Sequence, residues 1–158
     1  MKLLSALLVA AACAAAADSP HDRISGNWLT ADRHNVVKVA RCGEELCGVL
    51  VGLTPHLASD GKPVRDDENP DVRLRTRPAC GLEILRMRWN GGKQAFEGGL
   101  YDPQTGKSYT GNVSLNSAGA LKLRGYVLIP LLGRTELWSR YPSDLAGDCR
   151  MAETLRKK

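Results

Sequence analysis

Aromatic residues are scarce in this chain. Its 158 residues include one Phe, three Trp and four Tyr, which leaves little material for the base-stacking platforms of proteins that bind single-stranded nucleic acids. The formal net charge is only +5, and basic residues alternate with acidic ones instead of gathering into a basic patch. We therefore expect no nucleic-acid partner.

The chain also lacks the short motifs of common catalytic sites. It has no phosphate-binding loop and no Gly-x-Gly-x-x-Gly pattern. No Ser or Cys in a recognisable nucleophile elbow accompanies His21, His34 or His56, so no catalytic triad can be assembled. These absences predict a protein that is not an enzyme and needs no cofactor.

Long apolar runs are missing except at the start of the chain. The run over 3–12 is too short to span a bilayer, and alanines follow it at positions that a signal peptidase reads. The pattern predicts a signal peptide over 1–17, and hence a periplasmic or secreted protein without a membrane span. The alternative is a lipoprotein acylated at Cys13, although Ala10 stands where a lipobox usually has Leu.

Beyond the leader, apolar and polar residues alternate with a period of two, which is typical of half-buried strands. Leu121 and Leu123, for example, alternate with Lys122 and Arg124. All 16 glycines lie in this part of the chain, which favours turns and bulges over long helices. We predict eight strands, at about 26–32, 34–41, 46–53, 80–89, 94–101, 107–115, 120–129 and 133–141.

Most successive strands are separated by short turn signals, which favours a single all-β, eight-stranded antiparallel barrel over 18–142. A two-sheet sandwich is the alternative. The exception is one long loop, 54–79, which is rich in Pro and charge and is expected to hold a helical turn near 71–75. A tail over 143–158 follows the barrel, either as a short helix or without order.

Four cysteines follow the leader: Cys42, Cys47, Cys80 and Cys149. An even number in an oxidising compartment predicts two disulfides, and four cysteines allow three pairings. Cys42 and Cys47 bracket a tight turn between two predicted strands, which favours their pairing and leaves Cys80 with Cys149. Zinc is not expected, because the Cys-x4-Cys spacing has no second pair and no clustered His.

Gly26-Asn27-Trp28, at the start of the first predicted strand, resembles the Gly-x-Trp of lipocalins and the wider calycin superfamily. In those barrels the Trp packs at the closed end, near an Arg from the last strand. Arg140 lies in the last predicted strand here. The resemblance implies structural roles for Gly26, Trp28 and Arg140, with the guanidinium stacked on the indole.

A longer series of ordered segments runs from 26 to 140. They are Gly26-x-Trp28, Cys42-Gly43, Cys47-Gly48, Asp66-x-x-Asn69-Pro70-Asp71, Arg75-x-Arg77-Pro78, Gly81-Leu82, Ile84-Leu85, Tyr101-Asp102-Pro103-x-x-Gly106-Lys107-x-Tyr109, Leu121, Arg124-Gly125-Tyr126, Gly133-Arg134-Thr135 and Trp138-x-Arg140. Together they resemble a bacterial exported family designated domain of unknown function 2147 (DUF2147). The resemblance implies a calycin-like barrel but no agreed activity, and this chain departs from the family in having Cys80 and Cys149.

Four residues are candidates for ligand contact. Tyr101 and Tyr109 flank the turn that begins at Asp102-Pro103, where turn formation is favoured over a carbohydrate contact. Arg124 and Arg134 would seek an anion, such as a carboxylate, if they pointed into the barrel. The apolar alternation in the same strands favours an outward direction for both.

The acidic segment around Asp66 and Asn69 is the densest group of carboxylates. Calcium binding and glycoside hydrolysis are its functional alternatives, but it lacks the glycine of a calcium loop and shows no partner that would raise a carboxyl pKa. Turn and capping chemistry is therefore favoured, which gives Asp66, Asn69 and Asp102 structural roles.

The hypothesis that these observations favour is a binding protein. The barrel would hold a small apolar or amphipathic ligand, gated by the long loop, because few aromatics and many glycines leave room in its interior. The alternative is an envelope structural or protein-interaction module with a filled barrel and no ligand.

Overall fold

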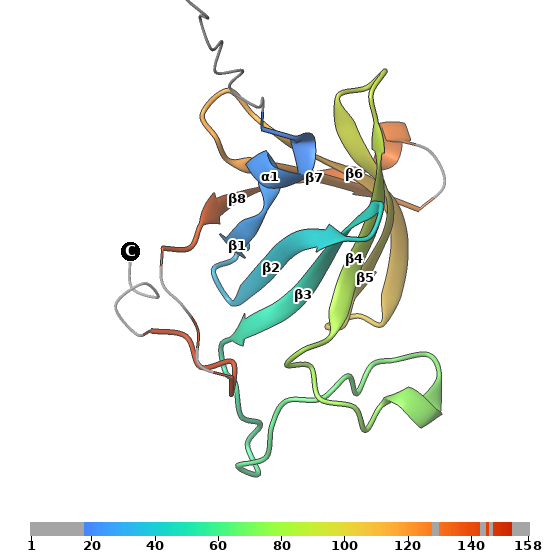
Figure 1. Ribbon diagram of the computed structural model, residues 1–158. Coiled ribbons are helices and arrows are strands. Elements are labelled where there is room, and N and C mark those ends of the chain that lie inside the picture. Colours follow the sequence, from blue (N-terminus) through green and yellow to red (C-terminus); the bar gives the residue numbers. More distant parts are fainter. Residues whose placement is uncertain (1–17, 128–129, 143–144, 146, 153–158) are drawn as a thin grey trace, which may run out of the picture.

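The computed structural model describes residues 18–127, 130–142, 145 and 147–152; the predicted signal peptide and Cys13 lie outside them. Eight antiparallel strands form a closed barrel, in which each strand pairs with the next and β8 with β1 (Figure 1). The predicted eight-stranded barrel is confirmed, and no two-sheet sandwich forms. The strands are β1 (Gly26–Leu29), β2 (Asn35–Cys42), β3 (Glu45–Leu53), β4 (Glu83–Asn90), β5 (Ala95–Asp102), β6 (Lys107–Leu115), β7 (Leu121–Tyr126) and β8 (Arg134–Arg140).

Three strand boundaries differ clearly from the predicted ones. β7 ends at Tyr126 instead of 129, and 128–129 lie outside the described residues. Turns explain the other two. β1 ends at Leu29 instead of 32 because Arg33 turns the chain with a φ of 63° and its N–H donates to the Thr30 carbonyl. β4 begins at Glu83 instead of 80 because the N–H of Leu82 closes a turn onto the Ala79 carbonyl.

A short helix, α1 (Pro20–Ile24), was not predicted, although its signals are in the sequence. The Ser19 hydroxyl accepts from the backbone N–H of Asp22, and the Asp22 carboxylate accepts from the backbone N–H of Ser19. This capping box, with Pro at the first helical position, fixes the helix start. In Figure 1, α1 lies at the upper end of the barrel, away from the long β3–β4 connection at the bottom.

Trp28 closes the barrel end beside α1. Its indole is fully buried and donates from Nε1 to the Ile24 carbonyl at 2.9 Å. The guanidinium of Arg140 lies 4.0 Å from the indole centroid and donates to the carbonyls of Ser25 and Arg23. A side chain at Gly26 would collide with that guanidinium. The last strand, the first strand and α1 are therefore joined at one point.

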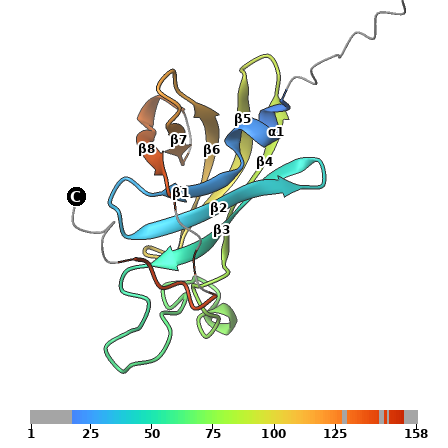
Figure 2. The same cartoon turned by 60° about the vertical axis from the view of Figure 1, so that its left-hand side comes forward.

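The 54–82 connection folds back on itself at the opposite end of the barrel (Figure 2). Two antiparallel bridges, Leu57 with Pro63 and Arg65 with Pro78, make it a double-stranded extension, and the turn predicted near 71–75 is the 3-10 helix η1 (Val72–Leu74). A second 3-10 helix, η2 (Pro130–Leu132), lies between β7 and β8.

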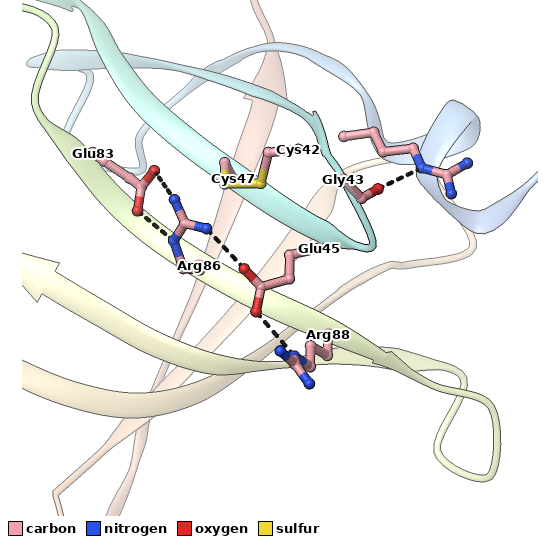
Figure 3. The surroundings of a disulfide bond; sticks show 8 residues. Cys42, Gly43, Glu45, Cys47, Glu83, Arg86 and Arg88 are labelled. Atoms are coloured by element: carbon pink, nitrogen blue, oxygen red, sulfur yellow. Dashed lines mark hydrogen bonds and ion pairs between the residues drawn. A yellow bond between two sulfur atoms is a disulfide. The ribbon is translucent and has the colours of Figure 1, made fainter.

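Both predicted disulfides are present. Cys42–Cys47 crosses the β2–β3 hairpin, next to Glu45, whose carboxylate accepts from Arg86 and Arg88 at 2.8 and 2.9 Å (Figure 3). Cys80–Cys149 fastens the tail to the end of the long connection. The tail was predicted as a short helix or without order. Residues 147–152 form a turn and a bridge to Leu53 and no helix, residue 145 has no regular structure, and the other tail residues lie outside the described ones.

Candidate functional site

A cavity of about 850 Å³ lies at the end of the barrel away from α1. Its mouth is formed by four connections, those between β1 and β2, β3 and β4, β5 and β6, and β7 and β8. Pockets for small molecules typically have volumes of ~300–1,000 Å³. Apolar side chains from five strands line its interior: Leu50, Leu53, Ile84, Leu100, Leu123 and Trp138.

Glycines from three neighbouring strands account for part of the cavity volume. Gly98 of β5 pairs with Gly111 of β6, which in turn pairs with Gly125 of β7. A Cβ at Gly98 or Gly111 would collide with the backbone of the adjacent strand. This row lets the strands approach closely and puts no side chain into the lumen at that level, as expected where another backbone comes near a glycine.

The two candidate arginines lie differently. Arg134 lines the cavity near its mouth, so the predicted outward direction is wrong for this residue. The cause is the register of β8, where Trp138 points inward and every second residue shares its face. Arg124 is not among the lining residues, and its Nη1 donates to the Thr135 hydroxyl at 2.8 Å.

Tyr109 and Tyr101 both line the cavity, but Tyr101 also has a second role. Its hydroxyl donates to Asp66 at 2.6 Å and accepts from Asn69 Nδ2 at 3.0 Å. Asp66 is 0% exposed and also accepts from Asn69 Nδ2 at 2.7 Å and from Arg77 Nε at 2.8 Å. We call these four residues the latch, because they bind the long connection to β5.

The hydrogen bonds of the latch favour the charged form of the Asp66 carboxyl. Burial raises the pKa of the Asp66 carboxyl, but hydrogen bonds from Tyr101, Asn69 and Arg77 outweigh it, so the pKa lies below its ordinary value. Burial and the neighbouring Asp66 carboxylate raise the pKa of Tyr101. The buried anion is therefore compensated by a cation and two neutral donors, which is what a charge without water requires.

The β5–β6 turn packs against the long connection at Gly106. Asp102 accepts from the backbone N–H of Gln104 and from the Thr105 hydroxyl, which gives it a turn-forming role. Gly106 has a φ of 67°, and a Cβ there would collide with the carbonyl of Glu68. The turn thus presents bare backbone to the connection, and only glycine suits this position.

The acidic segment shows no sign of a metal site. Asp66 is occupied by the latch, and Asp71 pairs with Arg73 at 2.7 Å. Within the described residues, no group of three or more His, Cys, Asp or Glu could hold a metal ion. No helix in the described part of the chain is long and apolar enough to cross a membrane.

Comparison with known proteins identifies the family of this chain and a solved structure with a similar fold. Residues 26–140 match the family described as "Uncharacterized protein conserved in bacteria (DUF2147)". The chain belongs to this family. Among solved structures, it is similar to protein HP1028 from the human pathogen Helicobacter pylori, described as belonging to the lipocalin family. The TM-score is 0.61 at 23% identity, covering 75% of this chain and 82% of that one. No curated protein matches the sequence.

The fold of this DUF2147 protein is thus lipocalin-like. The latch explains why three separated motifs occur together: Asp66-x-x-Asn69, Arg75-x-Arg77 and the segment that starts at Tyr101 meet at one buried carboxylate. The sequence pointed to each motif, but not to their contact, because Asp66 and Tyr101 are 35 residues apart. The glycine row was also missed, although the Gly98-Gly99 pair within a predicted strand is a signal for a bend.

Proposed function

We propose that this protein is exported and binds a small apolar or amphipathic ligand in the barrel. The observation that carries the proposal is the cavity of about 850 Å³, apolar inside and open at one end. An apolar lumen of this size that side chains do not fill favours a ligand, because protein interiors are otherwise packed to near-crystalline density. The two disulfides fit a periplasmic or secreted location.

The long connection forms a wall of this site. Val64 and Ala79 line the cavity, and the N–H of Ala79 donates to the Val64 carbonyl at 2.9 Å. The latch and the Cys80–Cys149 disulfide hold the same segment against the barrel. In the proposed function the connection is therefore a fixed part of the mouth and not the gate expected from the sequence, and the ligand enters a site that is largely formed beforehand.

A neutral fluorescent probe, N-phenyl-1-naphthylamine, tests the proposal. We expect a saturable rise in its fluorescence when the protein is added, because its rings would leave water for the apolar lumen. Leu123→Trp should weaken binding at least tenfold by filling the cavity. The matched control is Leu137→Trp, since Leu137 is an exposed residue on the outer face of β8.

Two outcomes would refute ligand binding in the lumen. One is the absence of saturable binding to a protein that unfolds cooperatively. The other is an equal loss of binding in both Trp variants. Export is tested separately, by N-terminal sequencing of protein from the periplasm or medium, which should begin at Asp18 and not at the initiator Met.

A protein-interaction role is the second candidate function. Around the β7–β8 connection, Leu131 and Leu132 are 84% and 79% exposed, and Val127 is 69% exposed. Exposed apolar residues that gather in one place are found at interaction surfaces. If this role is the main one, Leu131→Ser, at a residue that does not line the cavity, should abolish function in cells while probe binding by the purified variant is unchanged.

A further inference from the structure

The mouth of the cavity carries a net negative charge, although the chain as a whole is basic, with a formal charge of +5. Among the described residues that line the cavity, five are carboxylates and two are guanidiniums. The carboxylates come from all four connections of the mouth or the strand ends beside them. They are Asp32, Asp67, Glu68, Asp102 and Glu136, and the guanidiniums are Arg65 and Arg134.

Most of this negative charge is not neutralised within the protein. Asp102 accepts only neutral donors in its own turn, and Glu136 accepts from the indole Nε1 of Trp138 at 2.9 Å. Asp32 lies 3.5 Å from His34 Nδ1, which is an ion pair only when that imidazole is protonated. Within the described part of the chain, no hydrogen bond or ion pair is formed by the side chains of Asp67 and Glu68.

The two guanidiniums that line the cavity neutralise little of the negative charge at its mouth. Arg65 interacts electrostatically with Asp60, outside the cavity. Arg134 is two residues from Glu136 on the same face of β8, so their charges partly cancel at that wall. A ligand head at the mouth would therefore meet an excess of negative charge, above an interior lined by leucines and Trp138.

We propose that the cavity selects amphipathic molecules with a cationic head, such as a long-chain amine or quaternary ammonium compound. This inference rests on the proposed function and names the ligand class of the same site. The hydrocarbon part would replace water in the lumen, and the ammonium would lie among the carboxylates. Tyr109 also lines the cavity, and its ring offers a further surface for a cation. Fatty acids would place like charges together, which costs affinity.

Competition between ligands of equal chain length tests this proposal. Dodecylamine, dodecanol and dodecanoate, each below its micellar concentration, would displace bound N-phenyl-1-naphthylamine. At low salt we expect the amine to displace the probe at about one-tenth of the concentration needed for dodecanoate. High salt should reduce this preference to about twofold, because the charges at the mouth are exposed and screened.

Charge-neutralising variants show which carboxylates cause the preference for the amine over dodecanoate. The double variant Asp67→Asn with Glu68→Gln should lower the amine preference to about threefold at low salt. The control, Asp18→Asn with Glu44→Gln, changes the net charge equally. Asp18 precedes α1 and Glu44 lies in the β2–β3 turn, and both are remote from the mouth. The control variant should therefore keep the amine preference of the native protein.

Each result has one meaning. If dodecanol displaces the probe but dodecanoate binds as well as the amine, the ligand class is wrong and the binding function stands. If the mouth variant keeps the full preference, or the control loses it as well, these carboxylates are not its source and the inference fails. If neither the probe nor any of the three amphipaths binds, the proposed function itself is wrong.

Discussion

Asp66→Asn is the most direct perturbation of the latch. The substitution keeps the shape but removes the charge and turns one acceptor oxygen into a donor among donors. Arg77 would lose the partner of its 2.7 Å ion pair. Removing one member of a buried ion pair costs ~3–5 kcal/mol. Because the Arg77 side chain is 37% exposed and water recovers part of this loss, we expect about 2–4 kcal/mol.

Equilibrium unfolding in urea at neutral pH, followed by tryptophan fluorescence, measures this cost. The matched control is Asp71→Asn in the same connection, whose partner Arg73 has an 85% exposed side chain. That control should change stability much less, because exposed ion pairs contribute little. An Asp66→Asn variant as stable as the control would refute the latch as the anchor of the connection.

The same variant tests the charge of Asp66 through pH. The folded-state pKa of this carboxyl is lowered, so its contribution to stability is present above its unfolded pKa of about 4 and is lost as pH falls through the folded value. The stability difference between the native protein and Asp66→Asn should therefore shrink on acidification below about pH 4. A difference that stays constant down to acid unfolding would contradict a charged Asp66.

Two further stability predictions follow from the backbone and the disulfides. Gly106→Ala should destabilise the protein by at least ~1 kcal/mol more than Gly119→Ala, since both residues have positive φ but only Gly106 faces a backbone carbonyl; equal thermal shifts would contradict the close approach. Replacing Cys80 and Cys149 by Ser should cost about 4 kcal/mol and replacing Cys42 and Cys47 about 2, since the pairs are 69 and 5 residues apart in sequence; the reverse order in urea unfolding would refute this entropic account.

The sequence predicted the barrel well because its signals are local. Alternation with a period of two and turn residues define the strands and their hairpin order without knowledge of distant contacts. The Cys42–Cys47 pairing followed from a tight turn in the same way. α1 also has a local signal, in Ser19 and Asp22, but its five residues are too few to show a helical apolar period.

The site was less predictable because it depends on register and on docking between distant segments. A shift of one residue in β8 would reverse the direction of Arg134, and the apolar pattern of this short strand does not fix that register. Tyr101 lines the cavity, but the contact of its hydroxyl with Asp66 could not be predicted, because it forms only when the long connection folds back on the barrel. The room in the lumen depends on the glycine row, which forms only when three strands pair in this register.

The contact of Arg140 with α1 has a consequence for how the protein reaches its folded state. The guanidinium binds the carbonyls of residues 115 and 117 positions earlier, so the barrel cannot close until nearly the whole chain is available. Closing such a long loop is entropically costly and slows folding. A chain that emerges gradually from a ribosome would therefore stay open, with β1 unpaired on one side, until its last strand appears.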